Sequence, residues 1–393
     1  MRPVISAAPA LAAGSPRQGG EARPTLAGVA VGWREAWTAA AYGPDGFYAR
    51  GEAPADHFRT SVHASPLFAE AIGTLLERVD AALGRPDPLD LVDVGAGRGE
   101  LLAAVTAVDR PYRDRLRPLA VEIGPLGQRG TTVVRDLAEL PPVTGLLVAN
   151  EWLDDVPLDV VEQTPDGPRL VLVDADGSES LGPPPDPADR KWIDRWWPLL
   201  ATGDRAEVGR PRDDAWTAAV GRIERGVAVA IDYGHEASGR PVGGTLDGYR
   251  AGALVPPVPD GRGNLTAHVA LDSAAAAGRT AGAGDTRLDD QRTALLVLGV
   301  DPRRPPLDLA RTDPDRYMRA LARAGEAAEL TDRSGLGAFR WLVQGVGIRV
   351  PFPPAATRAR VRRAPAPPPP PPPSPPAPRP PTAPPPPPPR PGS

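Results

Sequence analysis

Two short stretches of this chain hold residues whose types and spacing could do chemistry. The first is an apolar run followed by three alternating glycines, Gly95, Gly97 and Gly99, and then by a helical pattern of leucine and valine. Glycine has no Cβ, so the backbone can bend sharply there and a ligand can approach it closely. The second stretch, residues 150–155, holds an amide and three carboxylates. Together they indicate a ligand site.

The order of strand, glycine turn and helix is typical of a nucleotide site, because the new helix points unpaired N–H groups at its ligand. The dinucleotide fingerprint G-x-G-x-x-G would need glycine at position 100, where this chain has Glu100. A pyrophosphate disfavours that charge, whereas S-adenosylmethionine carries a sulfonium and no phosphate. We therefore predict S-adenosylmethionine as the cofactor, with Asp93 beside the glycines. A purely structural glycine turn is the alternative.

Further cofactor contacts are predicted at the ends of the next two strands, expected at 119–123 and 132–137. In doubly wound sheets an acidic residue at the end of the second strand faces the ribose hydroxyls. Glu122, 23 residues after Gly99, is predicted to do so here, with a solvated glutamate as the alternative. Asp136 is the candidate acceptor for the adenine amino group.

A fourth strand, expected at 145–149, ends at the acidic stretch. Open α/β sheets bind ligands at the carboxyl ends of their strands, so residues 150–155 are predicted to form the lip that binds the methyl acceptor. A polar turn that caps a helix is the alternative. The predicted catalytic residues are Asn150, Glu151, Asp154 and Asp232, the last at the end of the apolar strand 227–231. The predicted cofactor-binding residues are Asp93, Gly95, Gly97, Gly99, Glu122, Asp136 and Asn150.

Composition argues against several kinds of site and partner. The 393 residues suffice for one large domain or two, and they include no cysteine, which excludes disulfides and Cys-ligated metals. The four histidines have no metal-binding spacing, so no metal is predicted. A net charge of −4 gives no reason to expect nucleic acid. We see no apolar run of about 18 residues and no signal peptide, and we expect no membrane span and a cytoplasmic location.

Three regions are predicted: a disordered N-terminus (1–25), one methyltransferase domain (26–350) and a disordered polyproline tail (351–393). The tail holds 23 of the 54 prolines, six arginines and no acidic residue. Such a sequence favours an extended, solvated chain. It is typical of ligands of SH3-like or WW-like domains, or of a spacer, and we favour a spacer or weak tether.

The domain is expected to alternate helices and strands. Helices are predicted at 27–42, 66–79 with Ser65 as cap, 191–200, 213–225, 290–298 and 313–330. A hairpin is expected at 158–173 and a closing strand at 339–345. The segment 57–65 and the helix after it have two interpretations. Either the helix only packs in the core, or the hydroxyls and two histidines of the segment cover the cofactor. His268, on an apolar run, reads as a core histidine.

Five motifs follow the glycine turn in order: 149–157, 231–235, 244–246, 265–269 and 339–345. Together they resemble the MidA-type S-adenosylmethionine-dependent methyltransferases, a family that includes the mitochondrial arginine methyltransferase that assists complex I assembly. The resemblance covers roughly 46–347. It implies a class I methyltransferase fold: an α/β, Rossmann-like, doubly wound sheet of seven mostly parallel strands, with an inserted substrate-side region. It also implies methylation of protein arginine, shown for some members.

We therefore predict a methyltransferase that modifies an arginine side chain of a partner protein. The protein must mainly align the nucleophile with the methyl group. Glu151 and Asp154 would fix the guanidinium, with Asn150 orienting and Asp232 nearby. A catalytically weak or inactive assembly or scaffold protein is the main alternative. A nucleotide-fold oxidoreductase is disfavoured, because this chain lacks the third glycine of the dinucleotide fingerprint. The sequence does not identify the acceptor protein, and a homodimer is one possible oligomeric state.

Overall fold

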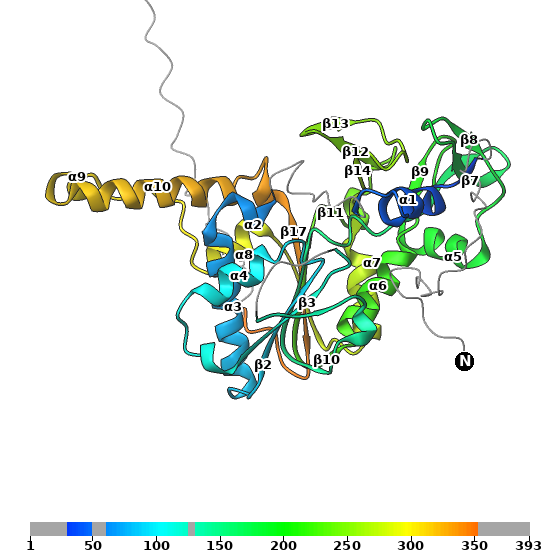
Figure 1. The fold of residues 1–393 in the computed structure, drawn as a ribbon. Helices are drawn as coiled ribbons and strands as arrows, with labels where there is room; N and C mark the ends of the chain where they lie inside the picture. Colours follow the sequence, from blue (N-terminus) through cyan, green and yellow to red (C-terminus); the bar gives the residue numbers. More distant parts are fainter. Residues whose placement is uncertain (1–29, 49–59, 125–129, 353–393) are drawn as a thin grey trace, which may run out of the picture. The chain divides into compact units, whose positions relative to one another are not determined.

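The structure is a computed structural model that describes residues 30–48, 60–124 and 130–352 (Figure 1). The chain divides into two compact units, Met1–Ala355 and Ala356–Ser393, and the described residues all lie in the first. The predictions for residues 1–25 and for 353–393 of the tail lie outside the described residues. None of the described helices is both long and apolar enough to cross a membrane.

A seven-stranded sheet organises the described chain, in the order β16-β17-β10-β5-β2-β3-β4. Its strands are β2 (Leu89–Val94), β3 (Leu116–Val121), β4 (Thr132–Val134), β5 (Val143–Asn150), β10 (Ile223–Asp232), β16 (Asp285–Asp290) and β17 (Arg340–Val346). Neighbours are parallel except for β17, which runs antiparallel to both β10 and β16. The predicted α/β sheet of seven mostly parallel strands is confirmed.

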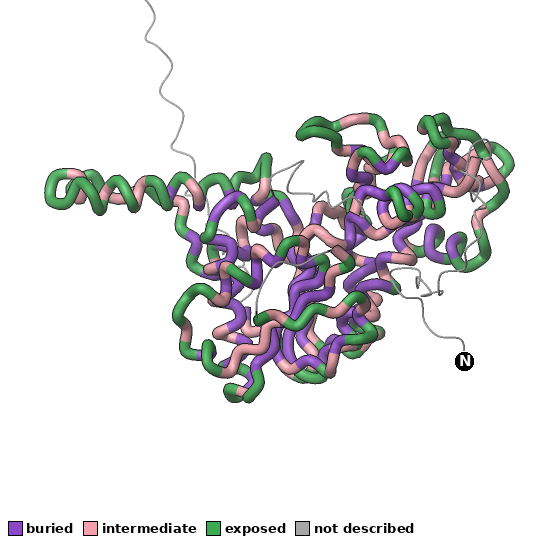
Figure 2. The backbone as a smooth tube through the Cα atoms, in the orientation of Figure 1, coloured by how far each residue is buried: buried purple, intermediate pink, exposed green. Residues whose placement is uncertain are grey.

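Helices cover both faces of this sheet (Figure 1). On one face lie α3 (Pro66–Leu83), α4 (Glu100–Ala107) and α8 (Gln291–Val297); on the other lie α6 (Arg210–Val220) and α7 (Leu271–Thr280). Alternate β5 side chains divide between the two cores: Leu146 and Val148 pack on the first face, Leu147 and Ala149 on the second. Burial on both faces explains why the strands read as continuous apolar runs (Figure 2).

The segments that follow β5 and β10, together with residues 31–42 near the start of the described chain, build the inserted region. One sheet joins β1 (Val31–Gly32), β6 (Val160–Thr164), β7 (Gly167–Val173), β8 (Glu179–Leu181) and β9 (Arg205–Glu207). A second joins β12 (Asp247–Arg250), β13 (Ala253–Val255) and β14 (Asn264–Thr266), and a third pairs β11 (Gly234–His235) with β15 (Val269–Ala270). Helix α1 (Trp33–Tyr42) buries Trp33 and Trp37 against this region. The predicted insertion and its hairpin are confirmed.

Several element bounds differ from the prediction. Helix α5 covers Pro187–Trp196 instead of 191–200, because Asp186 accepts from the backbone N–H groups of Ala188 and Asp189 and starts the helix early. Helix α6 ends at Val220 and β10 begins at Ile223, so the predicted helix over 213–225 was too long. The alanine-rich α7 and the edge strand β16 were not predicted.

The predicted helices at 66–79, 290–298 and 313–330 are present near those positions. The helix predicted at 27–42 begins only at Trp33, and the short helices at 61–64 and 307–312 were not predicted. Ser65 caps α3 by accepting from Leu67 N at 3.0 Å, as predicted. The short helix α2 (Ser61–Ala64) precedes it, and α9 (Leu307–Thr312) and α10 (Pro314–Leu330) come before β17. Short 3-10 turns are η3 (Arg113–Arg115), η4 (Leu137–Glu139), η5 (Ala237–Gly239) and η6 (Leu336–Ala338).

Candidate active site

The glycine turn connects β2 to α4 at the carboxyl edge of the sheet. Gly95, Gly97 and Gly99 have φ angles of 71°, 57° and 86°, in the left-handed region that favours glycine. A Cβ on Gly95 would lie only 2.9 Å from Cδ1 of Trp152. The turn therefore needs glycine for its backbone conformation and, at Gly95, for the close approach of a side chain from the acidic stretch.

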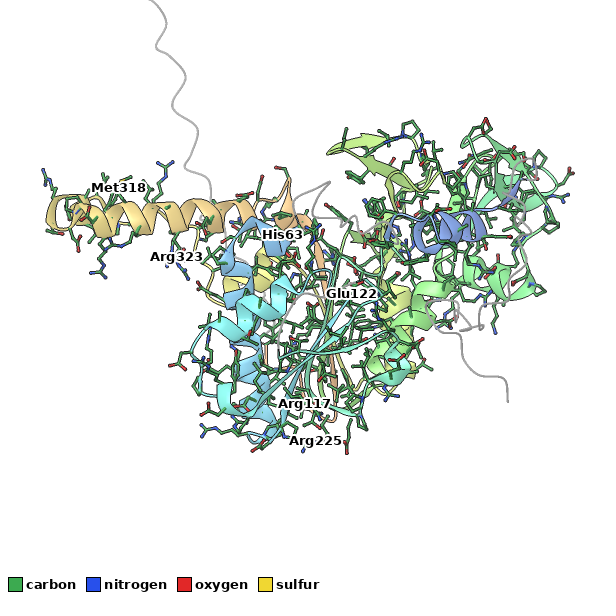
Figure 3. All side chains as sticks on the ribbon, viewed as in Figure 1. His63, Arg117, Glu122, Arg225, Met318 and Arg323 are labelled. Atoms are coloured by element: carbon green, nitrogen blue, oxygen red, sulfur yellow. The ribbon has the colours of Figure 1, made fainter. Side chains whose placement is uncertain are left out.

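Glu122 follows β3 and is hydrogen-bonded to the turn. Its Oε2 accepts from Gly97 N at 2.8 Å and its Oε1 accepts from Gly124 N at 2.7 Å. Figure 3 shows Glu122 toward one end of the sheet and Arg117 and Arg225 toward the other. A carboxylate offers about four lone-pair sites, so each oxygen of Glu122 can accept one more hydrogen bond, for example from a ribose hydroxyl. Glu122 thus follows the strand beside the glycine turn, and its contact with the ribose stays a prediction.

Acidic groups surround the turn. Asp93 is buried at the end of β2, and burial, followed by the charges of Glu122 and Glu100, raises its pKa to about 8. Such a site disfavours a phosphate and suits a ligand that carries a positive charge and hydroxyls. Asp136 uses one oxygen to accept from Ala138 N at 2.8 Å; its contact with adenine stays a prediction.

Asn150 and Glu151 lie where β5 ends. Glu151 has a φ of 52°, uncommon for a residue other than glycine. Its Oε1 accepts from Asn150 Nδ2 at 3.0 Å and from Ser61 N at 3.2 Å. Glu151 Oε2 and Asn150 Oδ1 are buried and have no hydrogen-bond partner among the described residues. Two neighbours thus fix the carboxylate, and its second oxygen remains available.

Asp232 and Asp154 complete the cluster. Strand β10 pairs in parallel with β5, with Ile231 opposite Asn150, so Asp232 follows at the same edge. Asp154 Oδ2 accepts from Thr266 Oγ1 at 2.9 Å. Asp154 Oδ1 and both carboxylate oxygens of Asp232 are buried and receive no hydrogen bond from a donor group among the described residues. The Asp232 and Asp154 carboxyl groups lie within hydrogen-bonding reach of one another, so they can share a proton. We call Glu151, Asp154 and Asp232 the carboxylate cluster.

Burial dominates the electrostatics of the cluster. It raises the pKa of Glu151 to about 8, with the charge of Asp154 as the second cause. Burial, followed by Asp154, also raises the pKa of Asp232 well above its ordinary value. Buried acceptors without donors are costly, whereas charge-assisted bonds to a cation are strong. The arrangement therefore suits a cation that brings several N–H donors.

Asp155, the third acid of the stretch, does not join the cluster. It accepts from Tyr48 OH and from Asn264 Nδ2, the latter at 3.0 Å, while Tyr42 OH donates to its carbonyl at 3.3 Å. Tyr42 and Tyr48 stack with their ring centroids 5.3 Å apart. The residues of the predicted lip thus have two roles: Glu151 and Asp154 belong to the carboxylate cluster, and Asp155 anchors the inserted region.

Arg212 was missed by the sequence prediction. It is buried on α6 and donates to four backbone carbonyls: Asp154 O at 2.5 Å, Val156 O at 3.1 Å, Ala267 O at 2.7 Å and His268 O at 3.0 Å. These bonds join the lip to the segment that holds Thr266. In an arginine-rich chain no local pattern distinguishes this arginine.

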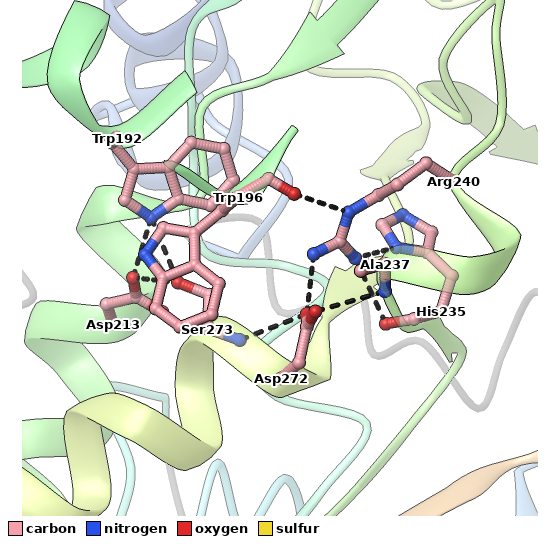
Figure 4. A network of polar contacts seen from close by, with 8 residues as sticks. All are labelled: Trp192, Trp196, Asp213, His235, Ala237, Arg240, Asp272 and Ser273. Carbon is pink, nitrogen blue, oxygen red and sulfur yellow. Dashed lines mark hydrogen bonds and ion pairs between the residues drawn. The ribbon is translucent and has the colours of Figure 1, made fainter. Parts of the chain in front are cut away.

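Aromatic rings border the cluster. Tyr233 stacks on His268 with centroids 5.7 Å apart and meets Phe339 at 4.0 Å. His268 is exposed, so its interpretation as a core histidine was wrong. Figure 4 shows His235 with Arg240, which donates to its Nδ1 at 2.6 Å and pairs with Asp272. Burial, followed by Arg240, lowers the pKa of His235 to about 3 and keeps it neutral.

The same network anchors the insertion farther from the cluster. Trp192 Nε1 donates to Asp213 Oδ2 at 2.7 Å, and Ser273 Oγ also donates to this carboxylate (Figure 4). Trp192 and Trp197 are buried, and Trp196 is half-buried. These contacts fasten α5 to α6 and α7, and so hold the insertion on the sheet.

Comparison with known proteins agrees with this geometry. Residues 128–286 match the family model described as "Putative S-adenosyl-L-methionine-dependent methyltransferase". This range includes Asp136, Asn150, Glu151, Asp154 and Asp232, and it begins after the glycine turn. The chain is 26% identical over 299 residues to the mouse protein arginine methyltransferase NDUFAF7, mitochondrial, covering 63% of this chain and 65% of the mouse protein. The rat protein of the same name is 26% identical over 297 residues, with the same coverage.

Two crystal structures from Burkholderia thailandensis share the fold. A COG1565 superfamily member bound to S-adenosyl-homocysteine has a TM-score of 0.68 at 22% identity, covering 82% of this chain and 89% of that chain. A native structure of a COG1565 superfamily protein has a TM-score of 0.66 at 23% identity, with the same coverage. The chain spans about 65% of the length of its curated relatives. These comparisons confirm the resemblance found in the sequence: the chain has the class I fold of the S-adenosylmethionine-dependent methyltransferases.

Proposed function

We propose that this chain is an S-adenosylmethionine-dependent methyltransferase that methylates an arginine side chain of a partner protein. The observation that carries the proposal is the carboxylate cluster. Four buried oxygens of Glu151, Asp154 and Asp232 receive no hydrogen bond from a donor group among the described residues, at the sheet edge that also holds the glycine turn. The matched family model and the arginine methyltransferases among the relatives support the same activity.

The residues at the turn fit the cofactor. Glu122 would accept hydrogen bonds from the ribose hydroxyls, and the nucleoside would lie close against the backbone of the glycine turn. Glu122 gives the turn an acidic group that suits a sulfonium and an ammonium group, and the buried Asp93 carboxyl, with a pKa of about 8, would ionise more readily beside such a cation. When bound, the cofactor supplies a methyl group already activated on sulfur.

The chain itself would bind the acceptor and take its proton. The oxygens of the cluster would hold the planar fork of a guanidinium in one orientation, as paired carboxylates do. One guanidinium nitrogen forms the new bond to the methyl carbon while the sulfur–carbon bond breaks, and that nitrogen then releases a proton. We assign this proton to Glu151, because Asn150 and Ser61 hold its Oε1 and leave Oε2 without a partner.

Labelled methyl transfer tests the proposal. The purified protein is incubated with methyl-labelled S-adenosylmethionine and a lysate of its host, and the labelled proteins are hydrolysed to identify the modified amino acid. We expect methylarginine, and we expect Glu151→Gln to reduce the rate by about 100-fold or more. Glu162→Gln is the matched control, because Glu162 pairs with Arg205 in the insertion.

Two outcomes would contradict the proposal. Undiminished transfer by a folded Glu151→Gln variant would remove the assigned role of the cluster. Binding of S-adenosylhomocysteine without any transfer would favour the alternative of a scaffold that keeps the fold.

A further inference from the structure

Among the described residues, two glutamines are completely buried, and each accepts a hydrogen bond from a tryptophan. Gln291, the first residue of α8, accepts from Trp341 Nε1 at 3.2 Å. Gln344 of β17 accepts from Trp216 Nε1 at 2.7 Å. Burying an amide is costly unless its hydrogen bonds are made. The remaining partners of each amide therefore indicate what it does in the protein.

The partners of Gln344 give it a structural role. Its Nε2 donates to Ala275 O of α7 at 3.0 Å and to Thr286 Oγ1 of β16 at 2.9 Å. With Trp216 of α6, these contacts join two strands of the sheet to the two helices on one of its faces. This glutamine thus stabilises the packing of the core.

The second partner of Gln291 lies in α2. An indole N–H can only donate, so the amide oxygen of Gln291 faces Trp341 and its nitrogen is left to donate in the other direction. Gln291 Nε2 donates to Ser61 Oγ at 3.1 Å, and Ser61 is also completely buried. Figure 1 shows α2 and α8 side by side next to β17. Gln291 therefore ties the start of α2 to the sheet.

Ser61 in turn contacts the carboxylate cluster. Its backbone N–H donates to Glu151 Oε1 at 3.2 Å, and Asn150 Nδ2 donates to the same oxygen at 3.0 Å. Asn150 is the sequence neighbour of Glu151 and moves with it, whereas Ser61 comes from a segment 90 residues earlier. The direction in which Glu151 points its second oxygen, Oε2, therefore depends on where α2 is held.

A contact at the other end of α2 is weaker than the bond to Gln291. His63 Nε2 lies 3.4 Å from Glu100 Oε1, and these side chains are 35% and 34% exposed. Exposed ion pairs contribute little to holding a segment in place, whereas a hydrogen bond between buried groups is stronger in the low dielectric of the core. The Gln291–Ser61 bond is thus well suited to fix α2.

We propose that Gln291 is a positioning residue for Glu151: through Ser61 it holds α2 so that Glu151 Oε2 is directed at the guanidinium of the acceptor. The inference rests on the proposed function, because it takes Glu151 as the group that binds the acceptor and accepts its proton. Trp341 fixes the orientation of the Gln291 amide, and Gln291 acts through Ser61 without contacting the substrate.

The first experiment compares the two buried glutamines. Gln291→Met and Gln344→Met remove the amide at similar side-chain volume, and both should lower the melting temperature because each leaves an indole N–H without its acceptor. We expect kcat for methyl transfer to fall about tenfold in Gln291→Met, because the carboxylate is misplaced, and to stay unchanged in Gln344→Met. Both variants should bind S-adenosylhomocysteine as the wild type does.

Ser61→Ala tests the same link with a smaller change. Alanine keeps the backbone N–H that donates to Glu151 and removes only the hydroxyl that accepts from Gln291. We expect kcat to fall about threefold to tenfold, again with unchanged affinity for S-adenosylhomocysteine.

A double variant shows whether the effect passes through Glu151. If Gln291 acts only by placing this carboxylate, adding Gln291→Met to Glu151→Gln lowers kcat no further. A general loss of structural integrity would instead lower kcat in both backgrounds.

Hydrogen exchange of the free protein follows α2 directly. We expect the backbone amides of residues 60–64 to exchange faster in Gln291→Met than in the wild type, because α2 loses its buried anchor. Gln344→Met should leave exchange in this segment unchanged.

The possible results separate this inference from the proposed function. In a wild type that transfers methyl groups, the inference alone is overturned by any of three results: unchanged kcat in folded Gln291→Met and Ser61→Ala variants, a further loss in the double variant, or unchanged exchange in residues 60–64. Absence of transfer by the wild type contradicts the proposed function and the inference with it.

Discussion

At the scale of residues, three acids at one sheet edge have environments that differ sharply. Asp155 is satisfied by Tyr48 and Asn264, whereas Glu151 and Asp232 keep buried oxygens that receive no hydrogen bond from a donor group among the described residues. The sequence could place all of them at strand ends, because buried apolar runs stop there. It could not say which side chain turns inward, since that follows from the positive φ of Glu151 and from distant partners such as Ser61.

The pH dependence of methyl transfer follows from the environment of Glu151. Its pKa is raised to about 8, so below pH 8 the unliganded protein holds this carboxyl largely protonated. Binding a cation and accepting its proton both need the ionised form. We expect kcat/KM to rise by up to about tenfold per pH unit between pH 6 and pH 8 and then to level off. Initial rates measured with the acceptor protein that the labelling experiment identifies, in its unmethylated form, check this. A pH profile that falls over this range would refute the role of Glu151.

Asp93 gives a prediction for stability. Its pKa is about 8 in the folded protein and about 3.9 in an unfolded chain. The folded state therefore binds the additional proton, and the contribution to stability is complete below about pH 4 and is lost as pH rises toward 8. We expect Asp93→Asn to raise the melting temperature relative to wild type more at pH 8 than at pH 5. Thermal unfolding without ligand measures this, and an equal difference at both pH values would contradict it.

At the scale of elements, the sequence predicted the strands of the parallel sheet and the glycine turn, because burial on both faces and glycine spacing leave strong local signals. Helix bounds were less secure. The helix predicted to begin at residue 191 begins at Pro187 instead, because Asp186 caps it and proline suits the first helical position. Helix α7 was missed because Leu271 is its one large apolar residue, and small alanines mark a buried face only weakly in the sequence. Strand β16 was missed because its charged sequence lies at a sheet edge.

Gly95→Ala tests the turn as an element. The added Cβ would meet Trp152 at 2.9 Å in a backbone with φ of 71°. We expect it to weaken S-adenosylhomocysteine binding at least tenfold and to lower stability by about 1–3 kcal/mol. Gly84→Ala is the control, because Gly84 has φ of 81° with open space around it. It should cost about 1 kcal/mol and leave ligand affinity unchanged. Equal ligand affinity in the wild type and Gly95→Ala would show that the turn does not approach the ligand.

At the scale of the whole molecule, the site depends on joining segments far apart in the chain. The sheet supplies Glu122, Glu151 and Asp232, the insertion supplies Thr266, and Arg212 fastens the insertion to the lip. The family resemblance in the sequence implied this architecture. Local patterns could not have found Arg212, because its partners are backbone carbonyls that carry no sequence signal.

Arg212→Met tests this connection. The change leaves carbonyls of the 154–156 and 267–268 segments without their donor, and we expect a loss of about 3–5 kcal/mol in the free energy of unfolding. Arg190→Met is the control, because Arg190 forms an exposed pair with Asp194 on α5, and it should cost at most about 0.5 kcal/mol. Chemical denaturation gives both values. Similar losses in the two variants would contradict the assigned importance of Arg212.

The most direct test of the account is calorimetric titration of S-adenosylhomocysteine into the wild-type protein. Its central claim is that the turn at Gly95–Gly99, with Glu122, binds an adenosine that carries an amino-acid end. We predict saturable one-to-one binding at ligand concentrations below about 1 mM, weakened at least tenfold by Glu122→Ala. Absence of binding up to that concentration, or equal binding by a folded Glu122→Ala variant, would contradict it.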